Sequence, residues 1–276
     1  MTDRYAVIGN PIAQSKSPVL HSAFAQQTQQ DLRYEALLAP VDGFVEAVRA
    51  FVADGGRGMN VTMPFKDDAF RFATRLSERA QRAQAVNTLA FRGEEIYGDT
   101  TDGVGLVRDI VHNLKRPLAG RKVLLLGAGG AVRGVIEPIL AQQPALLFIA
   151  NRTADKAAAL ADAFADLRGD TRLEGGGFEA IAGRFDVIVN GSAASMTGEL
   201  PPVPAGAWDA DSLVYDMAYK PQPTVFMQHA AATGAGTTAD GIGMLVEQGA
   251  ESFSLWREVR PDTAPVLAQL RAERGW

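Results

Sequence analysis

The feature that most constrains this chain is an aliphatic run at positions 123–126, followed at once by Gly-Ala-Gly-Gly-Ala at 127–131 and then by a helical stretch. A buried strand that enters a helix through a glycine turn is typical of a dinucleotide-binding βαβ unit. The glycines allow a tight turn and let the backbone approach a pyrophosphate, which the helix N-terminus stabilises. Val132 replaces the usual third small residue, and a plain tight turn without a ligand stays the alternative. We predict that the turn residues Gly127, Ala128, Gly129, Gly130 and Ala131 bind a dinucleotide.

The next expected strand, 146–150, ends in Asn151-Arg152-Thr153. NAD-binding sheets place an acidic residue at this point, where it bonds the ribose hydroxyls. Here that acid is missing, and Arg152 and Thr153 instead offer a cation and a hydroxyl to a 2′-phosphate. The sequence therefore favours NADP as the cofactor, bound by Asn151, Arg152 and Thr153.

Aliphatic runs alternate with Ala-rich helical stretches along most of the chain, which predicts an α/β fold with largely parallel sheets. We expect two α/β domains. The first is a substrate domain over 1–103 with a mainly parallel sheet, completed by a C-terminal helix that returns over 240–276, and the second is a Rossmann-like unit over 104–239. The expected strands are 5–8, 34–38, 58–62, 86–91, 122–126, 146–150, 187–190 and 214–216, and the strand at 86–91 is expected to pair with a second one that reaches about residue 97.

Composition narrows the class of partner. The net charge is −5 with no basic run, which argues against nucleic acid and anionic membranes. The chain has no cysteine, and its three histidines are far apart, so we expect no metal. No apolar stretch is long enough to span a bilayer, and the N-terminus lacks a signal core, so we expect a cytoplasmic protein. A small-molecule substrate is the expected partner, and a homodimer stays open.

Two short polar segments of the first domain suggest a site for an anion and a reactive amine. Ser15-Lys16-Ser17-Pro18 predicts a helix start with Ser17 as the N-cap, while Ser15 is free to bind a carboxylate. Capping alone explains Ser17 equally well. In the segment Asn-Val-Thr-Met-Pro-Phe-Lys at 60–66, Pro64 suits a first helical position and places Lys66 in the first turn, where it suits acid/base chemistry. From these residues alone, however, we favour a solvated Lys66 whose charge is balanced by Asp67 and Asp68 in the same turn.

A third segment, Gly-Asp-Thr-Thr-Asp-Gly at 98–103, forms a turn that leads into the second domain. Asp99 or Asp102 can cap the following helix. Its position at the junction of two α/β units also places a carboxylate where cofactor and substrate are expected to meet.

These segments, together with Ala-Val-Asn-Thr at 85–88 and Asp-Gly-Ile-Gly-Met-Leu-Val-Glu-Gln at 240–248, resemble the successive motifs of the shikimate dehydrogenase family, in the same order over essentially the whole chain. The resemblance implies reversible NADPH-dependent reduction of 3-dehydroshikimate to shikimate, a step of aromatic amino acid biosynthesis. It implies a catalytic pair, Lys66 and Asp102. It also implies that Ser15 and Ser17 bind the substrate carboxylate, that Thr62, Asn87 and Gln248 bind ring hydroxyls, and that Tyr219 contacts substrate while Met217 and Gly241 contact the cofactor.

The chain departs from the family pattern at Thr100, where an Asn is usual, and at Gly191-Ser192, where Ala-Thr is common. Both changes concern substrate preference and leave the reaction class intact. The alternatives are a quinate/shikimate dehydrogenase that also accepts NAD, a folate-type dehydrogenase, and a non-catalytic sensor of NADP or a shikimate-like ligand. The missing acid at Asn151 argues against the first, and a sensor has no need to keep both Lys66 and Asp102.

Overall fold

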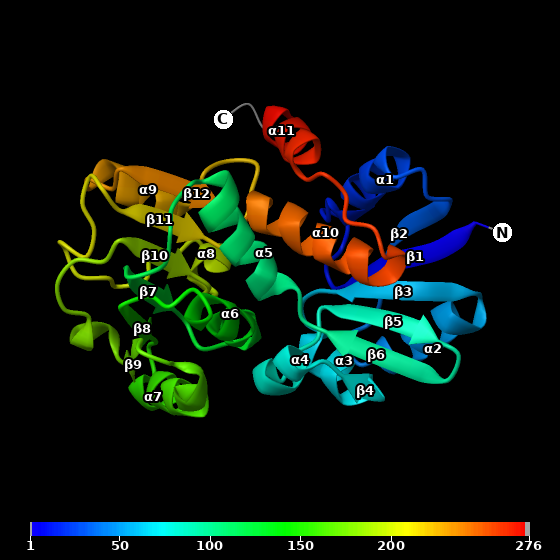
Figure 1. Cartoon of the computed structure of the whole chain (residues 1–276), viewed down its shortest axis with the longest axis horizontal. Coiled ribbons are helices and arrows are strands. Elements are labelled where there is room, and N and C mark those ends of the chain that lie inside the picture. Colours follow the sequence, from blue (N-terminus) through cyan, green and yellow to red (C-terminus); the bar gives the residue numbers. More distant parts are fainter. Residues whose placement is uncertain (1, 274–276) are drawn as a thin grey trace. The chain divides into compact units, whose positions relative to one another are not determined.

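The structure is a computed structural model that describes residues 2–273 and divides into two compact units, both visible in Figure 1. The N-terminal unit comprises the described residues up to Gly105 together with Leu245–Leu270. The second unit comprises Leu106–Met244 and the described residues from Arg271 on. The chain changes unit inside helices α5 (Asp102–Arg108), α10 (Ile242–Arg257) and α11 (Ala264–Ala272), whereas the sequence suggested changes only at Gly103 and Asp240.

The N-terminal unit is built on a six-stranded sheet in the order β2-β1-β3-β5-β6-β4. Strand β1 pairs in parallel with β2 and β3, β5 runs antiparallel to both β3 and β6, and β4 is parallel to β6. The strands are β1 (Asp3–Gly9), β2 (Leu32–Leu38), β3 (Gly56–Val61), β4 (Arg75–Leu76), β5 (Thr88–Arg92) and β6 (Glu95–Asp99). The helices are α1 (Ser17–Gln27), α2 (Phe44–Ala53), α3 (Lys66–Phe72), α4 (Glu78–Ala83) and α11 (Ala264–Ala272).

Both faces of this sheet are covered, because successive side chains of a strand point to opposite faces. On one face, Ala6 and Ile8 of β1 join an apolar cluster with Phe44 of α2. On the other, Tyr5 and Val7 pack in a cluster against which Trp256 of α10 lies. The parallel strands β1 and β3 therefore bring their carboxyl ends, and the loops that follow, to one edge of a buried sheet.

The second unit is a Rossmann-like sheet with every strand parallel, in the order β12-β11-β10-β7-β8-β9. Taken in chain order this is the arrangement 3-2-1-4-5-6 of doubly wound dinucleotide-binding folds. The strands are β7 (Lys122–Leu126), β8 (Leu146–Ala150), β9 (Arg172–Gly176), β10 (Val187–Asn190), β11 (Leu213–Asp216) and β12 (Thr237–Asp240). The helices are a π-helical turn (Asp109–Asn113), α6 (Gly130–Leu140), α7 (Ala154–Ala163), α8 (Ala194–Thr197), α9 (Val225–Ala232) and short 3₁₀ turns at Ala165–Leu167 and Phe178–Ala180.

Strand β7 lies at the centre of this second sheet and is buried along most of its length. Val123 and Leu125 face one apolar cluster with α6 and α7, whereas Leu124 and Leu126 face another with α9. A strand buried on both faces carries a continuous apolar run rather than an alternating one. This explains why the run at 123–126 stood out in the sequence.

The α/β class and the paired sheets agree with expectation, but β4, β9 and β12 were not anticipated. Strand β9 contains two glycines and is only half-buried, and β12 reads Thr-Thr-Ala-Asp. Both lie at the edges of their sheet, where one side of the strand is unpaired and a strong apolar pattern is not required.

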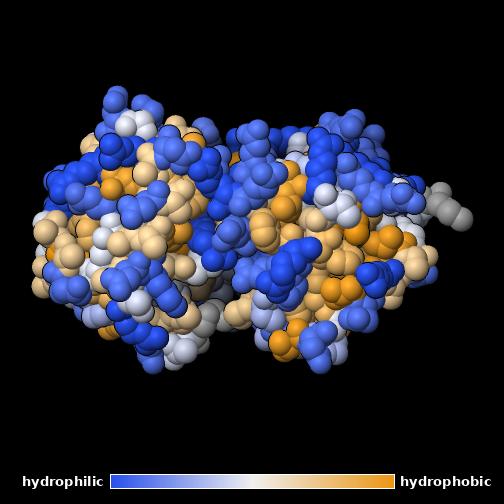
Figure 2. All heavy atoms as spheres, turned by 90° about the horizontal axis from the view of Figure 1, so that it is seen from below, coloured by the Kyte–Doolittle hydropathy of each residue, from blue (hydrophilic) through white to orange (hydrophobic). Residues whose placement is uncertain are grey.

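Apolar and hydrophilic side chains are interspersed on the visible face of each unit in Figure 2. Six large apolar residues of the described chain are exposed, namely Val19, Leu38, Val41, Met63, Leu200 and Val225. Within residues 2–273, no helix has the length and apolar character needed to cross a membrane.

Candidate active site

Lys66 is the first residue of α3 and forms an ion pair with Asp102, the first residue of α5. Its Nζ donates to Asp102 Oδ2 at 2.6 Å, and the side chains are 23% and 11% exposed. The carboxylate is favourable at a helix N-terminus, whereas the ammonium opposes the dipole of its own helix. Asp102 therefore balances the charge of Lys66, a role that we had assigned to Asp67 and Asp68 from the sequence. Asp68 pairs with Arg71 instead.

The other oxygen of Asp102 accepts a hydrogen bond from Asn87 Nδ2 at 2.9 Å. The same amide nitrogen lies 3.2 Å from Gln248 Oε1, so a residue of α10 joins the cluster. Asn87 and Gln248 are 3% and 7% exposed. Four of the predicted site residues thus form one contiguous hydrogen-bonded group within the N-terminal unit, with Lys66 on its more exposed side.

The hydrogen bonds of the two serines differ from those that the sequence suggested. Helix α1 begins at Ser17, Lys16 occupies the N-cap position, and no side chain caps it in the usual manner. Ser15 Oγ instead accepts from the backbone N–H of Ser17 at 3.3 Å. The prediction of Ser17 as N-cap was therefore wrong, and its buried hydroxyl contacts Tyr34 instead.

Thr62 directly follows β3, where its N–H donates to the carbonyl of Ile8 at 3.0 Å. The residues after it form a turn, in which the N–H of Phe65 donates to the Thr62 carbonyl at 3.0 Å. Helix α3 consequently begins at Lys66, and the expectation of Pro64 at a first helical position was wrong. The turn leaves Thr62 half-buried at the carboxyl end of the sheet.

Asp99 has a structural role that the sequence did not reveal. Arg79 forms a two-point contact with it, with N–O distances of 2.7 and 2.6 Å, and Ser77 also donates to it. Burial lowers the pKa of Arg79, but hydrogen bonds and charge from Asp99 and Glu251 outweigh this effect and leave the pKa raised. Asp99 thus anchors the turn of the 98–103 segment, whereas Asp102 of the same segment pairs with Lys66.

Five buried polar residues around this cluster were not predicted as site residues. Asn60 Oδ1 accepts from the hydroxyl of Tyr34 at 2.7 Å, and its Nδ2 donates to Ser252 Oγ at 2.9 Å. The Asn60 amide also reaches the hydroxyl of Thr88. Asn60, Thr88 and Thr101 lie inside the quoted motifs, whereas the only signal for Tyr34 and Ser252 was a polar group within an apolar strand or helix. The five residues are Tyr34, Asn60, Thr88, Thr101 and Ser252.

His21 packs against this buried layer, where Asn60 lies close enough to the ring to oppose in part the effect of burial on the pKa of His21. It is 1% exposed and stacks on Tyr34 with ring centroids 4.2 Å apart. Burial lowers the pKa of His21 to about 3, so the imidazole is neutral at pH 7. Neither ring nitrogen has a hydrogen-bond partner among the described residues. The ring therefore serves as an aromatic core residue next to Trp256 and Phe253.

The glycine turn of the second unit has the geometry that a pyrophosphate site requires. Gly127 has φ +109°, a conformation that L side chains rarely adopt, and a Cβ there would lie 3.1 Å from the Ser192 backbone nitrogen. Gly129 is the N-cap of α6, and a Cβ there would meet no atom within 4 Å. Val132 is fully buried and packs under the turn, which leaves open space over Gly129 and the helix start.

The segment after β8 is polar and largely free of competing contacts. Asn151 Nδ2 donates to the Thr153 carbonyl at 3.0 Å, and Thr153 is the N-cap of α7. Arg152 is exposed, and no carboxylate of residues 2–273 forms an ion pair with it. Its guanidinium is therefore available to an anion.

Met217 and Gly241 lie side by side at the carboxyl ends of β11 and β12. A Cβ on Gly241 would lie 2.1 Å from the Met217 carbonyl oxygen, so only glycine fits. Met217 is half-buried, as is Tyr219 two residues further on. Asp216 next to them is fully buried and accepts from Ser195, from Thr224 at 2.7 Å and from the Ala218 N–H, a network that the sequence did not reveal.

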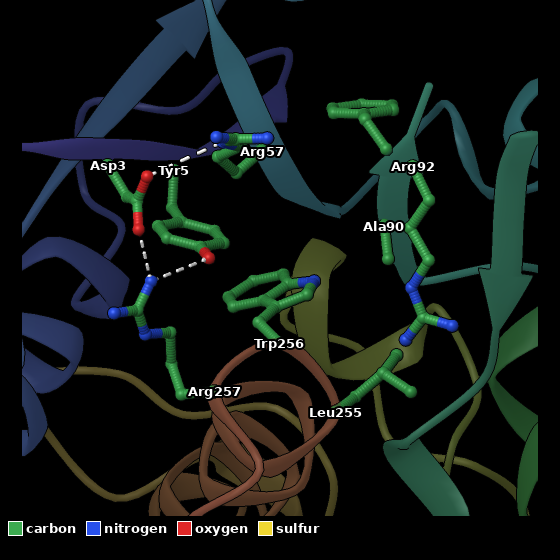
Figure 3. Close-up of a pocket in the computed structure, with 9 residues that line it drawn as sticks. Asp3, Tyr5, Arg57, Ala90, Arg92, Leu255, Trp256 and Arg257 are labelled. Atoms are coloured by element: carbon green, nitrogen blue, oxygen red, sulfur yellow. Dashed lines mark hydrogen bonds and ion pairs between the residues drawn. The ribbon is translucent and has the colours of Figure 1, made fainter. Parts of the chain in front are cut away.

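A separate pocket of about 230 Å³ lies in the N-terminal unit but contains none of the predicted residues (Figure 3). It is bordered by Asp3 and Arg57, at the amino ends of β1 and β3, and by Trp256 and Arg257 at the end of α10. Asp3 lies between the two guanidinium groups and pairs with both. The Lys66 cluster follows the carboxyl end of β3, so this pocket is at the opposite end of the strand.

The fold, the Lys66 cluster and the glycine turn together define a class of protein, the two-domain α/β dehydrogenases. One unit carries a glycine turn between a buried strand and a helix, and the other carries a lysine held by a carboxylate. Comparison with known families agrees. Residues 7–89 match the family described as shikimate dehydrogenase substrate binding domain, residues 109–197 match shikimate / quinate 5-dehydrogenase, and residues 241–271 match shikimate 5'-dehydrogenase C-terminal domain.

The chain is 59% identical over 274 residues to a shikimate dehydrogenase (NADP(+)) of Dechloromonas aromatica, with 99% of each chain covered. It therefore belongs to the shikimate dehydrogenase family. The crystal structure of an Ael1 enzyme from Pseudomonas putida is similar with a TM-score of 0.89 and 48% identity, covering 97% of this chain and 98% of that one. A shikimate 5-dehydrogenase from Thermus thermophilus, solved with NADP(H) and shikimate, is similar with a TM-score of 0.84 and 29% identity, covering 98% of this chain and 99% of that one.

Proposed function

We propose that this protein catalyses the reversible reduction of 3-dehydroshikimate to shikimate with NADPH, a step in the biosynthesis of aromatic amino acids. The observation that carries the proposal is the Lys66–Asp102 ion pair, held by Asn87 in a chain of this family. A full-length relative at 59% identity has the corresponding activity in its name. A protein that only bound these ligands would gain nothing from a lysine and a carboxylate placed for proton transfer.

Lys66 acts as the proton donor in the direction of reduction. As hydride reaches the carbonyl carbon, negative charge develops on the carbonyl oxygen, and the Lys66 Nζ supplies a proton to it. In the direction of oxidation the same amine takes the proton back. Asp102, 2.6 Å away, orients the ammonium group and accepts a hydrogen bond from a substrate hydroxyl. Asn87 holds the second carboxylate oxygen in place.

The remaining substrate contacts come from the predicted side chains around this pair. Ser15 and Ser17 bind the carboxylate near the N-terminus of α1, an eleven-residue helix whose dipole favours an anion. Thr62 follows β3, and Gln248 already contacts Asn87. Within the N-terminal unit we assign recognition of the substrate ring to Thr62, Asn87 and Gln248. Tyr219, a residue of the second unit, is a further proposed substrate contact.

The second unit fits NADP, which supplies the hydride when bound. The open space above Gly129 accommodates a pyrophosphate against the first turn of α6, and the positive φ of Gly127, which glycine adopts without strain, forms the tight turn beneath it. The exposed guanidinium of Arg152 suits the 2′-phosphate, with two donors in a planar fork. The proposed cofactor residues are Gly127, Ala128, Gly129, Gly130, Ala131, Asn151, Arg152, Thr153, Met217 and Gly241.

The proposal assigns the N-terminal unit to the substrate and the second unit to NADP. The test is absorbance at 340 nm with purified protein and each combination of shikimate or quinate with NADP⁺ or NAD⁺. A rise with shikimate and NADP⁺ alone is the expected result. A comparable rise with quinate or NAD⁺ indicates the relaxed quinate/shikimate enzyme, and no rise with any pair, while NADP⁺ still binds, indicates a sensor and contradicts the proposal.

A further inference from the structure

Behind the proposed active site lies a second layer of buried side chains that touch neither Lys66 nor Asp102. It consists of Tyr34 on β2, Asn60 on β3, Thr88 on β5 and Ser252 on α10. Thr88 and Ser252 are fully buried, and Tyr34 and Asn60 are 7% and 5% exposed. We call these four residues the supporting layer. Four different elements of the N-terminal unit converge on it.

The hydrogen bonds of Asn87 allow only one orientation of its amide group. Its Oδ1 accepts from the backbone N–H of Thr101 at 2.8 Å, and a backbone N–H can only donate. Its Nδ2 donates to the Asp102 carboxylate at 2.9 Å, and an ionised carboxylate can only accept. Asn87 therefore presents N–H to Asp102, and any group that bonds Oδ1 from behind must be a donor.

Thr88 is such a donor, because its hydroxyl lies 2.9 Å from Asn87 Oδ1. Its single proton is used in that bond, so Thr88 must itself accept from elsewhere. Asn60 Nδ2 meets this need at 3.1 Å. The same nitrogen lies 3.2 Å from the Asn87 carbonyl oxygen, which fixes the Asn60 amide as well. Asn60 thus donates to Thr88, and Thr88 bonds Asn87. Thr88 Oγ1 also lies 2.9 Å from Ser252 Oγ, a contact in which either hydroxyl can donate.

The two ends of the supporting layer are also fixed. Tyr34 donates its phenolic proton to Asn60 Oδ1 at 2.7 Å and contacts the hydroxyl of Ser17. Burial raises the pKa of Tyr34 well above its usual value, so the phenol stays protonated. Ser252 accepts from Asn60 at 2.9 Å and donates to the main-chain carbonyl of Gln248, one turn earlier in α10, at 3.0 Å. The layer therefore touches Ser17, Asn87 and Gln248, three of the residues assigned to substrate.

We propose that Thr88 and Ser252 are positioning residues: their hydroxyls, linked to each other and through Asn60, hold the Asn87 side chain and the main chain at Gln248 in place, and so maintain the geometry of the Asp102 carboxylate and the Gln248 side chain. The inference rests on the proposed function, because it concerns how that site is held. In a buried group of side chains, a side chain that loses its partner turns to find another. Small displacements of groups that position a substrate carry large losses of rate.

The experiment replaces each hydroxyl in the full-length protein and measures kcat, the KM for shikimate, the KM for NADP⁺ and the unfolding temperature. Thr88→Val keeps the side-chain shape and removes the donor to Asn87, and Thr88→Ser keeps the donor. We expect kcat/KM for shikimate to fall about 10- to 100-fold in Thr88→Val, with an increased KM for shikimate. We expect Thr88→Ser to stay within about three-fold of the parent, and the KM for NADP⁺ to stay within about two-fold throughout.

Ser252→Ala has a matched control in the second unit. Ser212 is also fully buried, and its Oγ donates to a backbone carbonyl, that of Phe185, at 2.8 Å. Both alanine variants lose a comparable hydrogen bond and some stability. We expect only Ser252→Ala to raise the KM for shikimate, by about three- to ten-fold. Partial unfolding lowers the active fraction and hence kcat, but leaves both KM values unchanged.

The wild-type protein is assayed first, so that a failure of the proposed function can be distinguished from a failure of this inference. Absence of shikimate turnover by the wild type contradicts the proposed function and removes the basis of this inference. An active wild type with an unchanged KM for shikimate in both Thr88→Val and Ser252→Ala overturns the inference alone. If Thr88→Val does not fold, the KM of Ser252→Ala beside Ser212→Ala decides the question.

Discussion

The proposed substrate site, around Lys66 and Asp102, and the proposed cofactor site, at the glycine turn and Arg152, are built in opposite ways. In the N-terminal unit, Lys66 and Asp102 belong to a dense group of buried side chains in which almost every polar atom has a named partner. In the second unit, the turn at 127–131 offers backbone and open space, and Arg152 is exposed without a carboxylate partner. One site is organised by side chains held from behind, and the other by the path of the main chain.

This difference predicts where substitutions act. A change in the buried group alters the geometry of the groups that hold and protonate the substrate, and so it affects kcat and the KM for shikimate. A change near the glycine turn or Arg152 alters contacts with a cofactor that are equal before and during the reaction, and so it affects affinity. Four predictions, from the largest effect to the smallest, test or refine this contrast.

The largest effect is expected for Lys66→Ala. Loss of the proton donor should lower kcat by about 10²-fold or more, while the affinity for NADP⁺ stays within about two-fold. Steady-state kinetics with shikimate, and fluorescence titration with NADPH, measure the two quantities. The matched control is Lys122→Ala, since this lysine is exposed at the start of β7 and lies outside the proposed substrate and cofactor sites. A Lys66→Ala variant with full turnover removes Lys66 from the mechanism.

The next effect is expected for Arg152→Ala. Loss of a charged hydrogen-bond donor to the 2′-phosphate should weaken NADP⁺ binding about 10- to 100-fold and leave NAD⁺ binding nearly unchanged. Calorimetric titration of both nucleotides measures the ratio. Arg168→Ala, an exposed arginine elsewhere in the same unit, serves as the control. Equal losses for NADP⁺ and NAD⁺ would show that Arg152 does not read the 2′-phosphate.

The third prediction separates the two glycines of the turn. Gly127→Ala places a side chain at φ +109°, which should lower the free energy of unfolding by about 1–3 kcal/mol. Gly129→Ala meets no neighbouring atom, so stability should change by less than about 0.5 kcal/mol. NADP⁺ affinity should nevertheless fall in Gly129→Ala, because the new methyl group occupies the space above the turn. Denaturant unfolding and nucleotide titration of both variants test this, and unchanged affinity in Gly129→Ala places the pyrophosphate elsewhere.

The smallest effect concerns His21 and the pH dependence of stability. Burial lowers the pKa of His21 to about 3, so the folded protein does not take up this proton near pH 6, whereas the unfolded chain does. The stabilisation is fully present above the unfolded pKa of about 6.5 and is lost as pH falls from there toward 3. The folded state should lose about 1 kcal/mol between pH 7 and about pH 5.5 from this residue.

Urea unfolding of the wild type and of His21→Leu at both pH values isolates the contribution. The variant lacks the titrating group, so its loss of stability over this interval should be smaller than that of the wild type by the same amount. Equal losses in the two proteins would mean that the unfolded and folded states bind this proton alike.

The sequence predicted features that depend on local pattern. Apolar runs identified β7, β8, β10 and β11, and the glycine turn after β7 was read directly from its context. The edge strands β9 and β12 escaped because half-buried strands with glycine or threonine carry no apolar run. The N-cap assignment of Ser17 failed since a capping rule fits both serines, and the contact from Ser17 N–H to Ser15 depends on the exact helix start.

The side-chain cluster of the N-terminal unit depends on contacts that no local pattern contains. Lys66 and Asp102 are 36 positions apart, and only pairing among the strands of this sheet brings them together. The resemblance to the family implied the pair, whereas physical reasoning from Lys66 alone favoured Asp67 and Asp68. Thr88 and Ser252 look like ordinary strand and helix residues in the sequence, and their role emerges only from their shared contacts with Asn60.

The most direct test of the central claim identifies the product. Wild-type protein is mixed with 3-dehydroshikimate and NADPH, consumption of NADPH is followed at 340 nm, and the products are identified by proton NMR. The account predicts one equivalent of shikimate for each equivalent of NADPH consumed. Consumption of NADPH without shikimate, or bound NADPH that is not consumed, would contradict it.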